Sequence, residues 1–159
     1  MTTTLWLLRH GDAVPHGARP DPERELTPKG ERQSRVAGQA MARLGIELDA
    51  CYTSPKLRAR DTARLACAAL GQDVVEERAL EAGFDRRDVE ELLQAHGDGA
   101  CVLLVGHNPD FEQLVLDLTG GRVDFKKGGL AGVRLGGSER GELIALLRPV
   151  ELEAIAAGS

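Results

Sequence analysis

Short apolar runs, each a few residues long, recur along the chain and predict β-strands. Residues 5–8 and 100–105 are almost entirely apolar, and runs of this length are typical of strands covered on both faces of a sheet. Residues 49–53 predict another short strand, and Val74-Val75 predicts a brief one.

Helical spacing fills most of the intervals between these runs. A polar loop over residues 13–25 precedes Thr27-Pro28, which predicts an N-cap followed by proline at the first helical position. This first helix is expected to end at Gly45. The other helices are expected to run from Pro55 to Gly71, over residues 85–96, and from Pro109 to about Thr119.

Two further strand-like runs, residues 130–135 and 142–147, close the pattern. The Gly-rich segment 136–141 between them predicts a β-hairpin. Strands alternate with helices up to this pair, which predicts an α/β fold: a mostly parallel central sheet with helices on both faces and a C-terminal hairpin. No repeat or change of composition divides the chain, so residues 1–159 are expected to form one domain.

Composition and charge exclude several classes of protein. Apolar residues make up 42% of the chain and charged residues 28%, which is typical of a soluble globular protein. The net charge of −5 disfavours binding to nucleic acid or to an anionic membrane, because both need a basic surface. The N-terminus lacks the features of a signal peptide, and no apolar run approaches ~20 residues, so we expect a cytoplasmic protein without a membrane span.

The residues that follow three of the strands carry the candidate chemistry. Arg9-His10-Gly11 follows the first strand, residues 54–58 follow the second, and Gly106-His107-Asn108 follows the strand that ends at Val105. Ligands of open α/β sheets bind beyond the carboxyl ends of the strands. Two of the four histidines and two arginines are therefore expected at one edge of the sheet.

These residue types suit a phosphate group. The guanidinium groups of Arg9 and Arg58 each offer a planar fork of donors that matches two phosphate oxygens. The helices after Ser54 and Asn108 begin at the same edge and add backbone N–H groups and partial positive charge. Gly11 would let the backbone approach an anion closely. No glycine-rich loop of the Walker type is present, so a nucleoside triphosphate site is not indicated.

A histidine beside two arginines is expected to be neutral, because nearby positive charge disfavours imidazolium. A neutral imidazole is a nucleophile, so His10 is a candidate to form a covalent phosphoryl intermediate. Other interpretations stay open at this point: a structural histidine at position 10, surface salt bridges for the two arginines, and a helix cap or core residue for His107. His16, in the polar loop, and His96, at a helix end, are expected to be solvated.

Neither a metal site nor a disulfide is indicated. His10 and His107 have no third Asp, Glu or His ligand to complete a metal site, so no metal or other cofactor is expected. Cys51, Cys67 and Cys101 are widely spaced among apolar neighbours, which predicts buried thiols.

Three motifs, in order, resemble those of the histidine phosphatase (phosphoglycerate-mutase-like) superfamily. They are Arg9-His10-Gly11, the stretch from Ser54 to Ala63 (SPKLRARDTA), and Gly106-His107-Asn108. The resemblance covers nearly the whole chain. It implies that His10 accepts the phosphoryl group and that Arg9, Arg58 and His107 bind it without a metal, in an α/β sandwich that is a monomer or a weak dimer.

Within this superfamily the chain looks like the SixA-type phosphohistidine phosphatases. Its small size, residues 9–13 (RHGDA) and residues 125–131 (FKKGGLA) carry this likeness. No long insertion provides a lid, so a shallow, open site is expected to admit a phosphohistidine displayed on another protein. Lys126 and Lys127 are expected to be a solvated pair, with contact to phosphate or to an acidic phosphoprotein as the alternative.

The proton donor is the weak point of the resemblance. Most relatives have a Glu or Asp that protonates the leaving oxygen, and the nearest candidate here is Glu81, whose surroundings match poorly. Asp21 and Glu23 in the polar loop are weaker candidates. SixA-type members similarly lack a clear acid, which a P–N bond tolerates because imidazole leaves without becoming an alkoxide.

The sequence therefore predicts a phosphatase that acts through a covalent phosphohistidine intermediate, with phosphohistidine in proteins as the expected substrate. The Asn108 amide is expected to join Arg9, Arg58 and His107 in contacting the phosphoryl oxygens. The first alternative is a phosphatase of small phosphomonoesters that uses the same residues. The second, from another class, is a non-catalytic phosphate-sensing or scaffold protein.

Overall fold

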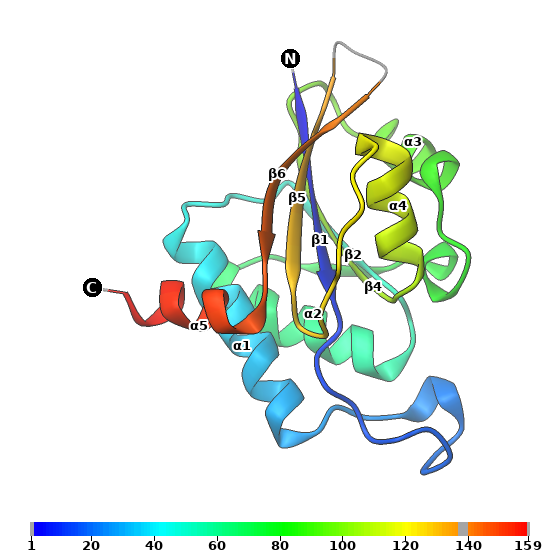
Figure 1. The fold of residues 1–159 in the computed structure, drawn as a ribbon, viewed down its shortest axis with the longest axis vertical. Coiled ribbons are helices and arrows are strands. Elements are labelled where there is room, and N and C mark those ends of the chain that lie inside the picture. Colours follow the sequence, from blue (N-terminus) through cyan, green and yellow to red (C-terminus); the bar gives the residue numbers. More distant parts are fainter. Residues whose placement is uncertain (1, 137–139, 159) are drawn as a thin grey trace.

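The computed structural model describes residues 2–136 and 140–158, and its centre is one mixed β-sheet (Figure 1). The strands of the sheet are β1 (Thr3–Arg9), β2 (Ala50–Thr53), β3 (Val74–Glu76), β4 (Cys101–Gly106), β5 (Leu130–Leu135) and β6 (Glu142–Leu147). They lie in the order β3-β2-β4-β1-β5-β6; the first four are parallel, and β5 is antiparallel to both of its neighbours. Residues 137–139 of the predicted hairpin turn lie outside the described residues.

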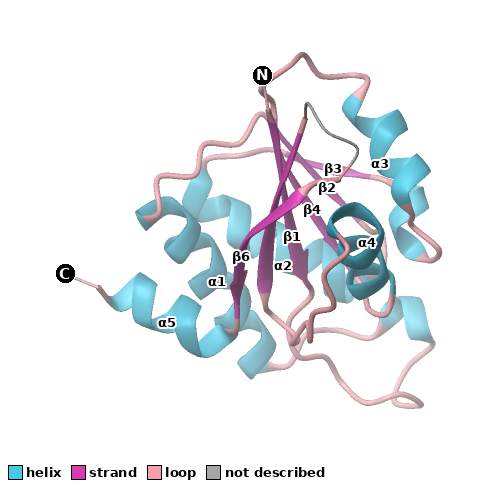
Figure 2. Cartoon of the chain, turned by 45° about the horizontal axis from the view of Figure 1, so that its top comes forward, coloured by secondary structure: helices cyan, strands magenta, loops and turns pink. Residues whose placement is uncertain are grey.

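Helices cover both faces of the sheet (Figure 2). The helices are α1 (Pro28–Arg43), α2 (Leu57–Leu70), α3 (Arg86–Leu93), α4 (Asp110–Thr119) and α5 (Pro149–Ala157), with two short 3-10 helices, η1 (Asp21–Glu23) and η2 (Arg78–Glu81). One face packs against α1, α2 and α5, and the other against α3 and α4. The predicted fold class is therefore confirmed. None of the described helices is long and apolar enough to cross a lipid bilayer.

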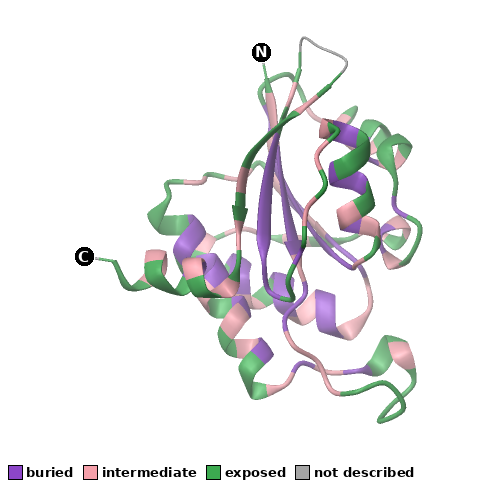
Figure 3. Cartoon of the chain, in the orientation of Figure 1, coloured by how far each residue is buried: buried purple, intermediate pink, exposed green. Residues whose placement is uncertain are grey.

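Strand β1 shows why the apolar runs are uninterrupted. Its side chains alternate between the two faces, so Leu5 and Leu7 join one core cluster whereas Trp6 and Leu8 join the other. When helices cover both faces of a sheet, every side chain of an inner strand faces a core. Polar residues therefore appear only where the strand ends. Buried residues accordingly concentrate in the inner strands and on the inner sides of the helices (Figure 3).

The boundaries of two predicted helices were wrong. Helix α2 begins at Leu57 rather than Pro55, because Lys56 is the N-cap and its ψ of 135° is not helical. Helix α3 ends at Leu93 rather than His96. The backbone N–H groups of Ala95 and His96 donate to carbonyls three residues earlier, so the last turn tightens out of α-helical geometry.

Helix α5 was not predicted from the sequence. Pro149 occupies its first turn, and the Glu151 carboxylate accepts hydrogen bonds from both the backbone N–H and the guanidinium of Arg148. The segment is short and its apolar residues do not follow one stripe, so periodicity gave no signal. It forms because Leu152 is buried in the core under α1.

Helices α1 and α2 are in close backbone contact at Gly38. A Cβ built on Gly38 would collide with the backbone carbonyl of Ala66. The contact matters for the site because α1 and α2 together hold the segments that follow β1 and β2.

We expect Gly38→Ala to destabilise the protein by ~1–3 kcal/mol through overpacking, even though alanine is the better helix former by about 1 kcal/mol. Urea unfolding of the variant measures this. Gln39→Ala, at an exposed position of the same helix, is the control and should leave the midpoint nearly unchanged. A Gly38→Ala midpoint at or above that of the unaltered protein would contradict the close helix contact.

Candidate active site

Parallel pairing brings the ends of β1, β4 and β2 to one place. The backbone N–H of His10 donates to the carbonyl of Gly106 at 3.1 Å, and that of Ser54 donates to the carbonyl of Val105 at 3.0 Å. The predicted convergence of the strand ends is confirmed: the rings of His10 and His107 lie with their centroids 5.3 Å apart.

These residues line a cavity of about 220 Å³ at the edge of the sheet. Its lining consists of Arg9, His10, Ala13, Val14, Pro15, His16, Arg24, Arg58, His107, Asn108 and Lys127. The list contains four cationic side chains and no carboxylate. A cavity of this charge within an acidic protein selects for an anion.

His10 is held with a lone pair on Nε2. Its Nδ1 lies 2.7 Å from the carbonyl oxygen of Gly11, and because a carbonyl can only accept, Nδ1 carries the proton. Burial lowers the pKa of His10 to about 3, and the charges of Arg58 and Arg9 act in the same direction. The ring is therefore neutral at pH 7, and Nε2 is available as a nucleophile.

His107 is neutral for similar reasons. It is buried, and burial, followed by His10 and Arg58, lowers its pKa to about 3. Its Nε2 lies 2.8 Å from the hydroxyl oxygen of Ser54.

Each of the two predicted arginines is fastened by one side of its guanidinium. Nη1 of Arg9 donates to the carbonyl of Phe125 at 2.8 Å. Nη1 of Arg58 donates to the carbonyl of Asp21 at 2.8 Å, and its Nη2 lies 3.4 Å from the Asp21 carboxylate. Burial lowers the pKa of both arginines. These hydrogen bonds fix the plane of each guanidinium group but use only some of its N–H donors.

The Asp21 carboxylate contacts several cationic side chains at the mouth of the cavity. It also lies 3.1 Å from Nζ of Lys56 and 3.5 Å from Nε of Arg24. Burial alone would raise the pKa of Asp21, but hydrogen bonds from Lys56 and Arg58 hold it below its usual value. An ionised Asp21 is a poor proton donor, so it fits the positioning of Arg58 better than the acid role considered from sequence.

Several buried polar atoms around the cavity have no hydrogen-bond partner. They are Arg9 Nε, Arg24 Nε, Arg58 Nε, His107 Nδ1 and Asn108 Oδ1. Buried polar groups are usually paired, and leaving one unpaired costs roughly 1–3 kcal/mol. Such a concentration at one cavity, mostly of donor groups, indicates a site that an anion completes.

Gly11 does not have the role expected from the sequence. Its N–H donates to Oγ1 of Thr62 at 3.0 Å, so this backbone donor is not available to an anion, and Gly11 is not among the residues that line the cavity. The position needs glycine for packing, since a Cβ there would meet the carbonyl oxygen of Gly30 at 2.6 Å. Gly11 thus supports His10 through its carbonyl.

Asn108 lines the cavity, but its side-chain N–H₂ donates to the Phe125 carbonyl at 3.0 Å. Its Oδ1 is an acceptor and would repel a phosphate oxygen. The expected contact between the Asn108 side-chain amide and phosphate is therefore not what the structure favours. Asn108 instead helps to fix the carbonyl that also receives Arg9.

The other two carboxylates considered as proton donors, Glu81 and Glu23, are not among the described residues that line the cavity. Glu81 is half-buried in η2, and Glu23 is exposed in η1. Of the two lysines, Lys126 is exposed and lies 2.9 Å from Asp124, whereas Lys127 reaches the cavity and lies 3.7 Å from Asp12. Lys127 is exposed as well, so the solvated interpretation fits both lysines, although Lys127 also lines the cavity.

The remaining histidines and the cysteines lie as follows. The side chain of His16 is 85% exposed, as predicted, but His96 is half-buried and its Nε2 lies 2.8 Å from the Tyr52 hydroxyl, so full solvation was wrong. The free thiols comprise buried Cys51 and Cys67 and half-buried Cys101. Across residues 2–136 and 140–158, no three His, Cys, Asp or Glu side chains converge as a metal site does.

Sequence reasoning missed Arg24 and the contacts of Asp21 and Ser54. Arg24 is buried although it lies in a polar loop, and the adjacent Leu26, buried through a β-bridge with Ala13, was the one available signal. Ser54 was noted only as part of a motif. Its contact is with His107, which lies 53 residues further along the chain, and no local sequence pattern indicates it.

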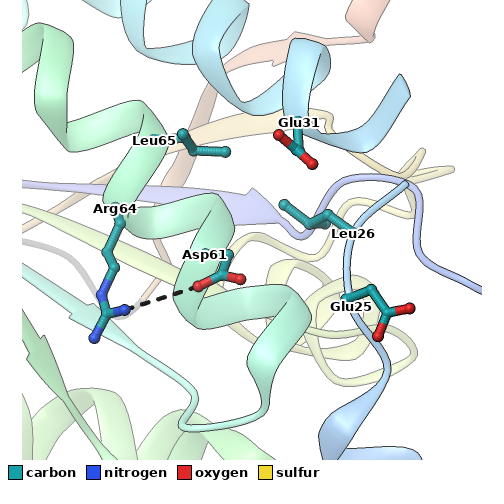
Figure 4. Close-up of a pocket in the computed structure, with 6 residues that line it drawn as sticks. All are labelled: Glu25, Leu26, Glu31, Asp61, Arg64 and Leu65. Atoms are coloured by element: carbon teal, nitrogen blue, oxygen red, sulfur yellow. Dashed lines mark ion pairs between the residues drawn. The ribbon is translucent and has the colours of Figure 1, made fainter. Parts of the chain in front are cut away.

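A second hollow beside α2 has the opposite character. It measures about 310 Å³ and is lined by Glu25, Leu26, Glu31, Asp61, Arg64 and Leu65 (Figure 4). Its one arginine is 3.9 Å from Asp61. Three carboxylates make this hollow unfavourable for an anion, so it does not compete with the cavity at His10 as a phosphate site.

Comparison with known proteins identifies the family. Residues 5–83 match the model of the histidine phosphatase superfamily (branch 1). The chain is also 35% identical over 144 residues to an uncharacterized protein of Picosynechococcus sp., covering 83% of this chain and 85% of that protein. The chain belongs to the histidine phosphatase superfamily. The 5–83 match includes the first two motifs, with His10 and Arg58.

Within the histidine phosphatase superfamily, the likeness to SixA extends over nearly the full length. A solved structure of the protein histidine phosphatase SixA complexed with tungstate superimposes with a TM-score of 0.84 at 28% identity, covering 94% of this chain and 99% of that one. A 2,3-bisphosphoglycerate-dependent phosphoglycerate mutase of Rhizobium meliloti is 34% identical over 106 residues. The chain spans about half the length of that mutase, 48%.

We expect the protein to lose stability as the pH falls from 7 to 5. In the unfolded chain a histidine has a pKa near 6.5 and takes up a proton in this range, whereas His10 and His107, with folded pKa values of about 3, do not. The unfolded state therefore binds more protons between these values, and each histidine costs about 2 kcal/mol at pH 5.

Urea unfolding at the two pH values measures this loss. A double variant, His10→Gln with His107→Gln, should show a weaker pH dependence, and His16→Gln, at an exposed position, should match the unaltered protein. If the double variant kept the full pH dependence, the two rings would not be buried in the neutral form.

Proposed function

We propose that this protein is a phosphatase that transfers a phosphoryl group to Nε2 of His10, and that its substrate is a phosphohistidine carried by another protein. The observation that carries the proposal is the pair of buried Nε donors of Arg9 and Arg58, which have no hydrogen-bond partner among the described residues, around a neutral, oriented His10. This arrangement supplies a nucleophile together with a preorganised place for the phosphoryl oxygens.

In the first step, the lone pair on Nε2 of His10 attacks phosphorus and the bond from phosphorus to the leaving group breaks. The electron pair of that bond departs with the leaving group. His10 keeps its proton on Nδ1, so the phosphorylated ring carries positive charge, which the carbonyl of Gly11 stabilises at 2.7 Å. Arg9 and Arg58 hold the negative charge on the phosphoryl oxygens.

In the second step, water attacks the phosphorus and releases a proton to solvent. The electrons of the P–N bond return to Nε2, so His10 leaves as neutral imidazole without needing a proton from a protein acid. The His10 Nδ1–H to Gly11 hydrogen bond is the same before and after the cycle. The enzyme therefore returns to its starting state with no net proton change on His10.

The leaving group decides the substrate class. An alkyl phosphate releases an alkoxide unless an acid protonates it, and no carboxylate is among the residues that line the cavity. A phosphohistidine whose second ring nitrogen has been protonated by solvent releases a neutral imidazole instead. The absence of carboxylates from the described lining supports phosphohistidine.

The size of the cavity supports the same substrate. A volume of about 220 Å³ is below the roughly 300–1,000 Å³ of most sites that enclose a small molecule. It suits a phosphoryl group and one ring, with the remainder of a partner protein outside. The similarity to SixA, which has been solved in complex with the oxyanion tungstate, supports a protein that binds phosphate.

His10→Ala is expected to lower turnover by ~10⁴-fold or more, because the nucleophile is lost. The protein should trap an acid-labile, alkali-stable phosphoryl group when mixed with a radiolabelled phosphohistidine protein and quenched, and His10→Ala should trap none. His16→Ala, which alters an exposed histidine at the rim, is the matched control. Full turnover by His10→Ala would disprove the mechanism.

A phosphatase of small phosphomonoesters is the second candidate, favoured by the identity to phosphoglycerate mutases. We expect kcat/KM for a phosphohistidine protein to exceed that for a sugar phosphate by ~100-fold or more, the scale of missing acid catalysis. Glu81→Gln is expected to leave the phosphohistidine rate unchanged. Faster ester hydrolysis that Glu81→Gln abolishes would favour the second candidate instead.

A further inference from the structure

The hydroxyl of Ser54 contacts His107, and its other hydrogen bond indicates which of the two groups donates. Ser54 is fully buried at the end of β2. Its Oγ accepts the backbone N–H of Lys56 at 3.2 Å and lies 2.8 Å from Nε2 of His107. The backbone pairing of Ser54 with Val105 keeps the hydroxyl and the ring in this relation.

The Ser54 hydroxyl has one hydrogen, and the question is which group accepts it. Lys56 N–H is a donor, so that contact uses a lone pair of the oxygen and leaves the hydrogen free. The other contact recorded for the hydroxyl is Nε2 of His107. A buried hydroxyl that fails to donate loses roughly 1–3 kcal/mol, so Ser54 donates to His107 and Nε2 is an acceptor.

A neutral imidazole carries one hydrogen, so an accepting Nε2 places it on Nδ1. Nδ1 of His107 is buried and has no hydrogen-bond partner within residues 2–136 and 140–158, although His107 lines the cationic cavity. With a hydrogen, Nδ1 is a donor toward the oxygens of an anion. With the opposite tautomer it would present a lone pair to the same oxygens and repel them.

We propose that Ser54 is a positioning residue that fixes His107 in the Nδ1–H tautomer and so makes it a donor to the phosphoryl group. The proposal rests on the function proposed above. It explains how two neutral histidines with centroids 5.3 Å apart do different work. Gly11 engages Nδ1–H of His10 and leaves a lone pair for attack, whereas Ser54 engages Nε2 of His107 and leaves a hydrogen for binding.

Nitrogen-15 NMR of histidine-labelled protein at pH 7, without substrate, reads the tautomer directly. We expect the His107 ring to show Nδ1–H, assigned by its absence from the spectrum of His107→Gln. In Ser54→Ala the ring should become a mixture of tautomers. An Nε2–H ring in the unaltered protein would overturn the proposal, and this test requires no variant of Ser54 to fold.

Kinetics supply the second measurement. Ser54→Ala is expected to lower kcat by ~10–100-fold with KM changed less than about threefold, because a donor that strengthens in the transition state is misplaced. Ser54→Thr, which keeps the hydroxyl, should restore most of kcat. Thr53→Val removes a neighbouring buried hydroxyl that bonds to the carbonyl of Ser54 and not to His107, and should stay near the unaltered rate.

The outcomes separate this proposal from the function on which it rests. If no phosphoryl group forms on His10, the proposed function fails whatever the tautomer of His107. If the phosphoryl group forms but Ser54→Ala keeps both kcat and the Nδ1–H tautomer, the role of Ser54 fails and the phosphatase mechanism stands.

Discussion

The parallel pairing of β1 with β4 is the constraint on which the rest of the site depends. The two strands are about ninety-five residues apart in the chain, yet their pairing sets His10 beside His107. Both strands are buried on both faces, so a slip of one residue would exchange the two core surfaces and turn each following residue the wrong way. The packing of the cores therefore also fixes the geometry of the chemistry.

Burial destabilises the cationic groups that the site brings together, and hydrogen bonds to backbone carbonyls offset part of this cost. Carbonyl oxygens of Phe125 and Asp21 receive the outer edges of Arg9 and Arg58, and the carbonyl of Gly11 receives His10. These backbone dipoles bring no net charge, and Asp21 adds a single negative charge against the several cations that it contacts, so the cavity stays positive. The two histidines remain neutral because protonation would add charge to an already cationic, poorly solvated place.

The sequence made the strand ends predictable because apolar runs of this kind stop abruptly at polar residues. His10, Arg58 and His107 could thus be placed at one edge from the pattern and the topology rule alone. What could not be predicted depends on contacts between distant segments: the buried Leu152 that holds α5, and the neighbour that makes position 11 a glycine. A residue type shows what a side chain can do, but its partner follows only from the packing.

Arg58 is secured by the loop that precedes α1. Residues 13–25 carry Asp21 to the guanidinium, and the same loop supplies Ala13 to His16 of the cavity wall. Loops accept insertions and substitutions far more readily than buried strands. The segment between Pro15 and Asp21 is therefore where a protein engineer can reshape the entrance for a different phosphoryl donor, while the nucleophile and the sheet beneath it are left as they are.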